Sequence, residues 1–312
     1  MASPTNRLLT CNDTKGASVG ERTDLEFPSG EGACAAWVYR PEAARSRPGP
    51  CIVMGHGFSL TRHDGLPAYA EQLAAAGATV VVFDHRYLGD SPGEPRQRFR
   101  KPMQREDWRS AVEAARSLDG VDPDQIVLWG FSFGGGHAIE TAAEDGRIAA
   151  VVALAPFADG LARVLATPIP TVAWILPRAI ADRAGRHNLI PVTGQPGTKA
   201  AMAFPGEADG FAAVVTPGSP WRNEISPGVF LTVALHRPVA KAKKVTCPLW
   251  VGLGEQDITV SGKAIVRIAA RAPRAELHRY PCDHWQTFLG DAPERIAADQ
   301  IDFLRRQGIL VA

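Results

Sequence analysis

Short apolar runs alternate with stretches of helical periodicity along most of the chain. The runs are apolar at successive positions, which indicates strands buried on both faces, and they lie at 51–55, 79–83, 126–129 and 148–154. The helical patterns that separate and follow them lie at 66–76, 104–117 and from about 133 to 144. This alternation predicts a mostly parallel central sheet with helices on both faces.

The same alternation resumes towards the C-terminus, and strand-like stretches also precede it. The C-terminal part predicts a strand at 248–253, a helix at 262–270, a strand at 275–280 and a last helix at 293–306. Two earlier strands are predicted at 24–27 and 33–39. Residues 1–22 are polar and without pattern, so we expect a poorly ordered N-terminal lead-in there.

The alternation is interrupted between residues 158 and 242. This segment contains many prolines among apolar residues, so it is too apolar for a linker and too rich in proline for a sheet. We therefore predict a helical cap insertion at 158–242, and a core formed by 23–157 and 243–312. Four aromatic residues of the segment are candidates for lining a substrate pocket: Trp174, Phe204, Trp221 and Phe230.

One serine lies in a sharp turn between a predicted strand and a predicted helix. The motif Gly130-x-Ser132-x-Gly134 directly follows the apolar run at 126–129 and directly precedes a helical pattern. Glycines at these two places let the chain reverse tightly, which lifts the serine hydroxyl from the backbone at the positive end of a helix. We predict that Ser132 is the nucleophile of an acyl-transfer enzyme.

A nucleophilic serine needs a base, and that base needs an acid to orient it. Reacting groups of open α/β sheets lie beyond the carboxyl ends of strands, so the loops after strands supply the candidates. Asp257, which follows the strand at 248–253, is the predicted acid, with Glu255 and Asp159 as alternatives. Asp257 could instead cap the next helix.

His284 is the predicted base, because it lies in the loop after the strand at 275–280. His278 falls inside that strand, so we expect it to be a structural histidine whose ring nitrogens find hydrogen-bond partners nearby. The resulting chain order of nucleophile, acid and base is Ser132, Asp257, His284. No metal is needed for this chemistry, and Cys282-x-His284 has no second ligand pair at zinc spacing.

The oxyanion of such a reaction needs two backbone N–H donors. The first is predicted to be the N–H of Phe133, the residue after the nucleophile, and the second that of Phe58, in the loop after the strand at 51–55. We expect His56 to brace this loop rather than to take part in catalysis.

Composition excludes several other classes of function. The chain has 34 basic and 33 acidic residues, so no overall field attracts nucleic acid or an acidic membrane. We interpret the small basic cluster at 241–244 as a solvent-exposed stretch that leads into the next strand. Five cysteines, odd in number and without a C-x-x-C spacing, together with the lack of a signal sequence, indicate a cytoplasmic protein with reduced thiols. We expect a small-molecule acyl substrate and no cofactor, and the oligomeric state stays open.

Several of these segments together resemble the α/β-hydrolase fold superfamily. The resemblance rests on His56-Gly57, the run Asp84-His-Arg-Tyr-Leu-Gly-Asp-Ser91, the Gly130-Phe-Ser-Phe-Gly134 turn, Asp257 and His284. The segments 74–86, 93–96 and 107–109 are similar to bacterial serine hydrolases related to dienelactone hydrolases and Xaa-Pro peptidases, and to fungal polyketide transferases and thiohydrolases. These relatives imply a Ser-Asp-His triad, a helical cap and acyl chemistry without a cofactor.

We therefore expect a serine hydrolase that cleaves a carboxylic ester or lactone through an acyl-enzyme. An acyl thioester hydrolase or acyltransferase of the polyketide-transferase type would use the same triad with a different leaving group or acceptor. A non-catalytic small-molecule receptor on the same scaffold is the alternative from another class. Peptidase activity is ranked lower, because no acidic cluster in 158–242 offers an anchor for a substrate amino terminus.

Overall fold

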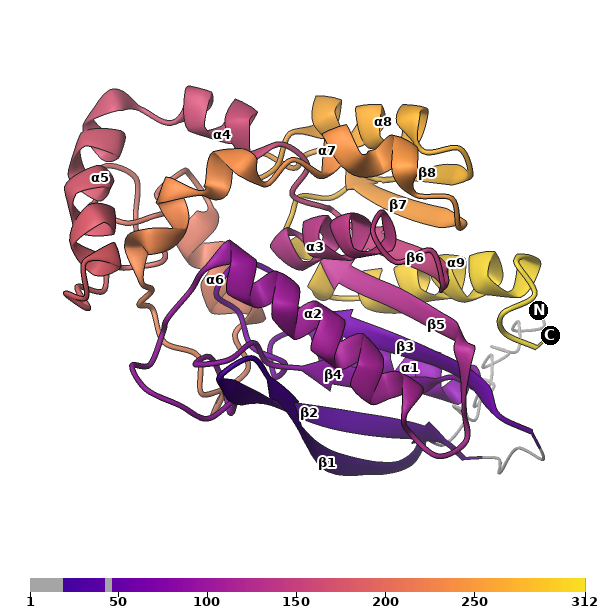
Figure 1. Ribbon diagram of the computed structural model, residues 1–312. Coiled ribbons are helices and arrows are strands. Elements are labelled where there is room, and N and C mark those ends of the chain that lie inside the picture. Colours follow the sequence, from indigo (N-terminus) through magenta and orange to yellow (C-terminus); the bar gives the residue numbers. More distant parts are fainter. Residues whose placement is uncertain (1–18, 43–46, 312) are drawn as a thin grey trace, which may run out of the picture.

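The computed structural model describes residues 19–42 and 47–311, and these residues contain one eight-stranded sheet (Figure 1). Its strand order is β1-β2-β4-β3-β5-β6-β7-β8; β2 is antiparallel to both of its neighbours and the remaining pairs are parallel. The predicted mostly parallel sheet is thus confirmed. The strands are β1 Val19–Ser29, β2 Gly32–Pro41, β3 Gly49–Gly55, β4 Thr79–Phe83, β5 Val121–Phe131, β6 Ile148–Leu154, β7 Leu249–Gly254 and β8 Ala275–Tyr280.

Two strands, β1 and β5, begin five residues earlier than the sequence predicted. β1 begins at Val19, so residues 19–22 belong to the sheet rather than to the lead-in, and residues 1–18 lie outside the described part. β5 begins at Val121 and so includes Asp122-Pro-Asp124, a sequence typical of a turn. The turn is present as an irregularity within the strand, because the register against β3 passes from Gly49–Val121 to Cys51–Ile126.

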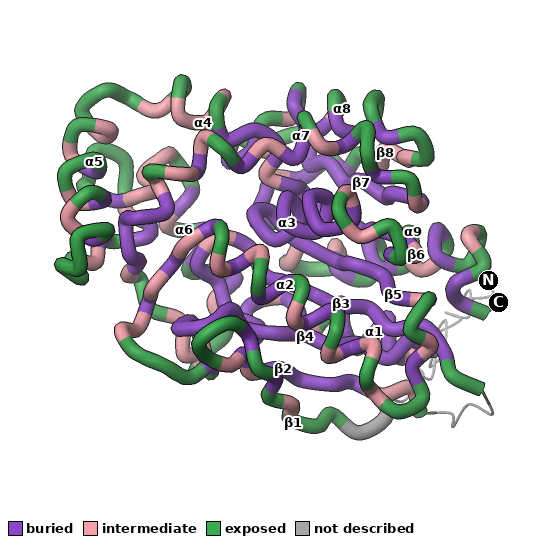
Figure 2. Tube along the Cα trace, viewed as in Figure 1, coloured by how far each residue is buried: buried purple, intermediate pink, exposed green. Residues whose placement is uncertain are grey.

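Helices cover both faces of the sheet. α1 packs against α9 on one face, while α2, α3, α7 and α8 form a continuous layer on the other (Figure 1). Alternate side chains of the central strands enter two separate cores, as Ile52 and Val53 of β3 do. Figure 2 shows the buried strands between two layers of partly exposed helices. The core helices are α1 Leu66–Ala75, α2 Lys101–Arg116, α3 Phe133–Ala142, α8 Gly262–Arg271 and α9 Ala292–Arg306, and short 3₁₀ turns lie at η3 Ala242–Lys244 and η4 Gln286–Phe288.

The 158–242 segment combines helices with irregular stretches at 184–206 and 215–226, and it lies beyond the carboxyl ends of the central strands (Figure 1). It contains α4 Gly160–Ala166, α5 Ile169–Arg183, α6 Glu207–Val214, the 3₁₀ turns η1 Pro227–Leu231 and η2 Val233–Leu235, and α7 Pro238–Lys241. Its two ends meet in a neck, where Gly160 N–H donates to His236 O (2.8 Å) and Val239 N–H donates to Ala158 O (3.0 Å). α7 already belongs to the helix layer of the core, where it contacts α3 and α8.

No single helix of the described residues is long and apolar enough to cross a bilayer. Only α4 and α5 taken together have that length and composition, and they are bent by 120° at the break between them.

Candidate active site

Ser132 occupies a strained turn between β5 and α3. Its φ of 52° and ψ of −116° are values that a residue with a side chain rarely adopts. Three backbone hydrogen bonds hold the turn: Ser132 N–H donates to Leu154 O at 3.0 Å, and Ser132 O accepts from Phe157 N–H at 2.7 Å and from Gly136 N–H at 3.0 Å. The surrounding backbone therefore imposes a conformation that the serine alone would avoid.

The two glycines of the motif are required by close backbone contacts. A Cβ at Gly134 would lie 2.5 Å from Gly55 O, and a Cβ at Gly130 would lie 2.5 Å from Gly135 N. Real Cβ atoms essentially never come this close to backbone atoms, and a rigid backbone cannot yield as a flexible side chain can. The end of β3 therefore packs directly against the first turn of α3.

Asp257 and His284 are in direct contact beyond the ends of β7 and β8. Nδ1 of His284 lies 2.7 Å from Oδ2 of Asp257, and both side chains are buried. The other carboxylate oxygen of Asp257 accepts hydrogen bonds from the N–H groups of Thr259 (2.8 Å) and Val260 (3.0 Å). These three bonds fix the orientation of the carboxylate, which in turn fixes the tautomer and direction of the imidazole.

The alternative acids and the second histidine have structural partners elsewhere. Asp159 accepts from Leu161 N–H and Ala162 N–H at the N-terminus of α4 and pairs with Arg237 (3.0 Å). Glu255 is exposed and lies 3.7 Å from Arg279. His278 lies within β8 and stacks on Trp250 with ring centroids 5.1 Å apart. Asp257 is therefore the member of this group that contacts His284, and the following helix is capped by Ser261 instead.

The loop after β3 brings Phe58 close to the serine. A Cβ at Gly57 would lie 3.3 Å from Cβ of Ser132, so the loop passes directly beside the nucleophile candidate. The rings of Phe58 and Phe133 are 5.7 Å apart. Phe133 is the first residue of α3, where helical geometry offers its N–H no acceptor within the helix.

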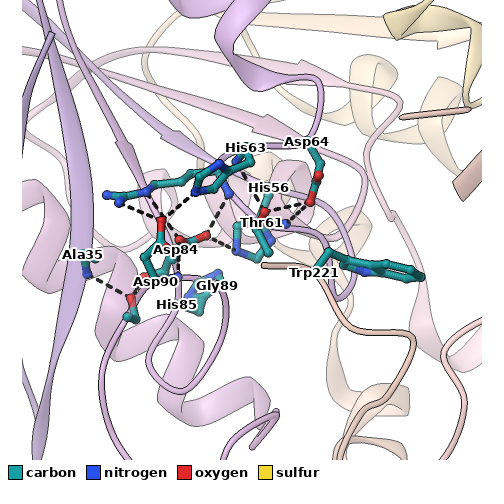
Figure 3. A network of polar contacts seen from close by, with 12 residues as sticks. Ala35, His56, Thr61, His63, Asp64, Asp84, His85, Gly89, Asp90 and Trp221 are labelled. Atoms are coloured by element: carbon teal, nitrogen blue, oxygen red, sulfur yellow. Dashed lines mark hydrogen bonds and ion pairs between the residues drawn. The ribbon is translucent and has the colours of Figure 1, made fainter. Parts of the chain in front are cut away.

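A buried polar network fixes this loop from behind (Figure 3). Asp84, which follows β4, accepts hydrogen bonds from the N–H groups of Arg62 (2.7 Å) and Asp90 (3.0 Å). Burial raises the pKa of Asp84 to about 6 and lowers the pKa of His56 to about 3. Neutral His56 contacts Gly57 O at 2.9 Å and packs edge-on against the ring of His85, 5.1 Å away. These contacts suit the bracing role expected of His56.

The same loop is tied to the 158–242 segment through Asp64. Asp64 accepts from the N–H and hydroxyl of Thr61 and, at 3.1 Å, from the N–H of Thr216. Thr216 returns a hydrogen bond from its hydroxyl to His63 O (2.8 Å), and Thr61 contacts the hydroxyl of Ser219 (3.2 Å). The position of the loop beside Ser132 is therefore coupled to the position of residues 216–219.

An apolar cavity of about 130 Å³ opens at Ser132 between the core and the 158–242 segment. Its walls come from the loops after β3, β5, β6 and β7 and, in the 158–242 segment, from α4, α5, residues 201–202, η1 and η2. They include Phe58, Phe133, Phe157, Ile175, Met202 and Phe230. Of the four aromatic candidates, Phe230 lines this cavity. The other three are engaged elsewhere: Trp221 stacks on Phe211 (5.7 Å), Phe204 lies under Arg163 (4.3 Å) and Trp174 lies under Arg178 (4.8 Å).

The chain resembles known proteins along nearly its whole length. Residues 50–188 match the α/β hydrolase fold family. The quorum-quenching protein AidA of Acinetobacter baumannii is 36% identical over 288 residues, which cover 91% of this chain and 94% of that protein. The chain belongs to the α/β-hydrolase family. A thiohydrolase, aneE, of Aspergillus aculeatus is 32% identical over 48% of this α/β hydrolase and 49% of its own length.

A solved structure shows the same architecture. The α/β hydrolase GrgF from Penicillium sp. sh18 superposes with a TM-score of 0.78 at 26% identity, covering 92% of this chain and 99% of that one. The predicted fold class and family are thus both confirmed, including the likeness to fungal polyketide transferases and thiohydrolases.

One buried cluster of this α/β hydrolase was not anticipated from the sequence. His137, Glu140 and His236 place ligand atoms within 4.8 Å of one another, behind the first turn of α3. The i, i+3 spacing of the first two was a readable signal, but His236 is brought in by the 158–242 segment. Lys101 already lies 3.0 Å from Glu140 and supplies its counter-charge, which disfavours a second cation at the same carboxylate. Because burial lowers the pKa of both histidines, we read the cluster as a buried polar network around the Lys101–Glu140 ion pair that fastens the segment to α3.

Proposed function

We propose that this hydrolase cleaves a carboxylic ester or lactone through an acyl-enzyme on Ser132. The observation that carries the proposal is the 2.7 Å contact between Asp257 and His284, beyond the same sheet end at which Ser132 lies in its strained turn. Each of the three residues follows a different strand, and each lies where the reacting groups of such sheets are found.

The proposed reaction begins when Ser132 Oγ attacks the substrate carbonyl carbon and His284 Nε2 accepts the hydroxyl proton. Asp257 stabilises the resulting imidazolium without taking the proton itself. The N–H groups of Phe58 and Phe133 hold the oxyanion, and each such donor is worth about 3–4 kcal/mol of transition-state stabilisation. His284 then donates its proton to the leaving alcohol, and afterwards activates water to release the acid.

The cavity indicates the kind of acyl or alcohol group that is bound. Its walls are largely aromatic and aliphatic, with Ser132 at one end, so apolar groups of moderate size gain most from burial there. We infer an apolar acyl or alcohol part that is larger than acetyl. We also propose a cap role for the 158–242 segment, because it supplies much of the cavity wall.

A thioester substrate, or transfer of the acyl group to an acceptor, is the second candidate. The similarity to the thiohydrolase aneE and to GrgF, which is named a polyketide transferase, favours this candidate. The same residues would serve, since a thiolate leaving group changes only the second proton transfer.

The test is active-site labelling with a fluorophosphonate, read by intact mass and peptide mapping, in the wild type, Ser132→Ala and His284→Ala. We expect one label, on Ser132, that is lost in the first variant and strongly slowed in the second. Rates on paired short-chain oxygen esters and thioesters then decide between the two candidates. Folded wild-type protein that takes up no label and turns over neither ester would refute the proposal and favour a binding protein.

A further inference from the structure

Arg163 of α4 is the charged residue in the wall of the cavity at Ser132. The other described residues that line this cavity are apolar, apart from the hydroxyl side chains of Ser132, Thr167 and Thr259. An arginine side chain keeps its positive charge in proteins. A charge held against apolar walls costs free energy unless an anion lies close to it. The position of Arg163 therefore needs a physical reason.

The guanidinium of Arg163 is held in place, but few of its donors are used. Nη1 donates to Thr259 O (3.3 Å), and Cζ lies 4.3 Å from the centre of the Phe204 ring. The backbone is fixed as well, because the N–H of Arg163 donates to Asp159 O (3.1 Å) and its carbonyl accepts from the Thr167 hydroxyl (2.9 Å). Nε and Nη2 make no hydrogen bond with a described residue, and the side chain is half-buried. Most of the N–H donors are thus free for a ligand.

The buried arginines of the core, by contrast, are paired with carboxylates. Arg62 lies 2.9 Å from Asp90, and Arg86 lies 2.5 Å from Asp107. Within residues 19–42 and 47–311, no carboxylate lies within 4.0 Å of the Arg163 guanidinium. The protein therefore supplies counter-charges where arginines have a structural role, and leaves this one open to the cavity.

Two acids lie near enough to affect Arg163, but neither satisfies its guanidinium. Burial lowers the pKa of Arg163, while Glu207 and Asp257 raise it. Asp257 already uses one oxygen for His284 and the other for two backbone N–H groups. Glu207, the first residue of α6, is 1% exposed, and burial raises its pKa, which favours the neutral form of the carboxyl. The charge of Arg163 is therefore only weakly compensated from within the protein.

We propose that Arg163 binds a carboxylate carried by the apolar part of the substrate, and so selects esters or lactones that bear such a group. The inference rests on the proposed function and names the substrate class for it. The planar guanidinium matches a carboxylate, which can accept two parallel N–H bonds from it. The single negative charge of a carboxylate balances the single positive charge of the cavity wall, whereas a phosphate group would leave negative charge uncompensated.

This contact would fix the substrate relative to the catalytic residues. The carbonyl that holds Arg163 belongs to Thr259, and the N–H of Thr259 donates to Asp257 (2.8 Å). The guanidinium is thus tied to the same loop that orients His284. Because Arg163 belongs to the 158–242 segment, a bound carboxylate also links that segment to the core through the substrate.

The test measures binding to Ser132→Ala, which lacks the proposed nucleophile and so leaves an ester probe intact. The probes are the monomethyl esters of adipic, suberic and sebacic acid. Each is compared with its dimethyl ester, which has the same chain without the charge. Isothermal titration calorimetry gives the dissociation constants. We expect the monoester to bind about tenfold or more tightly than the diester at one or more chain lengths, because hydrogen bonds to a charged acceptor are the stronger ones.

Adding Arg163→Gln to Ser132→Ala should abolish this preference, and Arg178→Gln in the same background is the matched control. Arg178 also lies over an aromatic ring, that of Trp174, and donates to a backbone carbonyl (2.7 Å), but it does not line the cavity. The control should leave the preference unchanged. Arg163→Lys, which keeps the charge but not the planar fork, should retain part of it. If Arg163→Gln does not fold, Arg163→Met, which keeps an apolar chain over Phe204, is held to the same loss.

Equal binding of monoester and diester at every chain length would overturn the inference, and so would a preference that survives Arg163→Gln. The proposed function is tested separately, by fluorophosphonate labelling of the wild type and by release of nitrophenol from methyl 4-nitrophenyl suberate, a neutral ester. Labelling and turnover without a carboxylate preference would refute the role of Arg163 alone. A carboxylate preference in a protein that neither labels nor turns over would refute the proposed function alone.

Discussion

The backbone strain at Ser132 gives a sharp prediction about stability. Ser132→Gly and Ser132→Ala both remove the hydroxyl, so both should lose activity. They differ in what they do to the turn, because φ 52° and ψ −116° match the first central position of a type II′ turn, at which glycine is the preferred residue. Alanine keeps the steric conflict between Cβ and the backbone, whereas glycine removes it.

The magnitude follows from two opposing effects. Strain in a sparsely populated backbone region costs about 1–3 kcal/mol. Glycine offsets part of that gain, because it loses about 0.5–1 kcal/mol more conformational entropy on folding than alanine does. We therefore expect Ser132→Gly to unfold with a free energy about 1–2 kcal/mol higher than that of Ser132→Ala.

The assay is equilibrium unfolding in urea, followed by tryptophan fluorescence and far-UV circular dichroism. Ser110, in the interior of α2, provides the matched control, because there glycine should be about 0.8–1.0 kcal/mol less stable than alanine. The sign of the glycine-minus-alanine difference should therefore reverse between positions 132 and 110. The reasoning is refuted if Ser132→Gly is no more stable than Ser132→Ala.

Three further predictions concern the turn, the acid and the buried ion pair. Gly134→Ala should lose activity and about 3 kcal/mol of stability, because its Cβ meets the backbone of β3. The control, Gly146→Ala, has open space around it, so its activity should be unchanged and its stability should change by no more than about 0.5 kcal/mol. Thermal unfolding and an ester assay measure both variants. Asp257→Asn should lower kcat about 10³- to 10⁴-fold on an ester without loss of fold, which circular dichroism and steady-state kinetics would show; a loss below tenfold would contradict the assignment. Burial raises the pKa of Glu140, but contact with His236 and Lys101 outweighs burial and lowers this pKa from 4.5 to about 2. The ionised carboxylate therefore adds on the order of 3 kcal/mol to the free energy of unfolding above pH 4.5, and this stabilisation is lost as the pH falls towards 2. Glu140→Gln should accordingly be less stable than the wild type at pH 7, and urea titrations at several pH values should show the difference shrinking in acid.

The sequence predicted the structure best where the residue types of a short segment determine its conformation. The apolar runs at 79–83 and 148–154 have the same bounds as β4 and β6, because consecutive buried positions leave little choice of conformation, and the strand predicted at 275–280 has the same bounds as β8. The turn at Ser132 could also be predicted, because glycines on either side of a serine between an apolar run and a helical pattern are typical of a tight strand-to-helix turn. The loops that follow β7 and β8 then led to Asp257 and His284, since sheet topology brings the carboxyl ends of parallel strands together.

Contacts between segments that are distant along the chain could not be predicted from local residue patterns. Glu207 lies in a stretch whose sequence shows no clear periodicity, and only the packing of α6 on Trp285 reveals which way it faces. His236 reaches Glu140 across 96 residues of chain. The turn residues at 122–124 indicate that the strand begins after them, but Val121 already pairs with Gly49 of β3, and the turn is a bulge at which the register shifts.

The neck of the 158–242 segment has a consequence for how such proteins diversify. Because Gly160 and His236, and Ala158 and Val239, are joined by backbone hydrogen bonds, the two ends of the insertion are already closed on each other. Backbone bonds make few demands on side-chain identity, apart from Gly160, where a Cβ would meet the backbone of Val233. A different insertion with the same two ends can therefore be accommodated without shifting β6 or β7. Recombination at this neck would exchange much of the cavity wall in one event and keep Ser132, Asp257 and His284, provided that the incoming segment again supplies a partner for Asp64, as Thr216 does here.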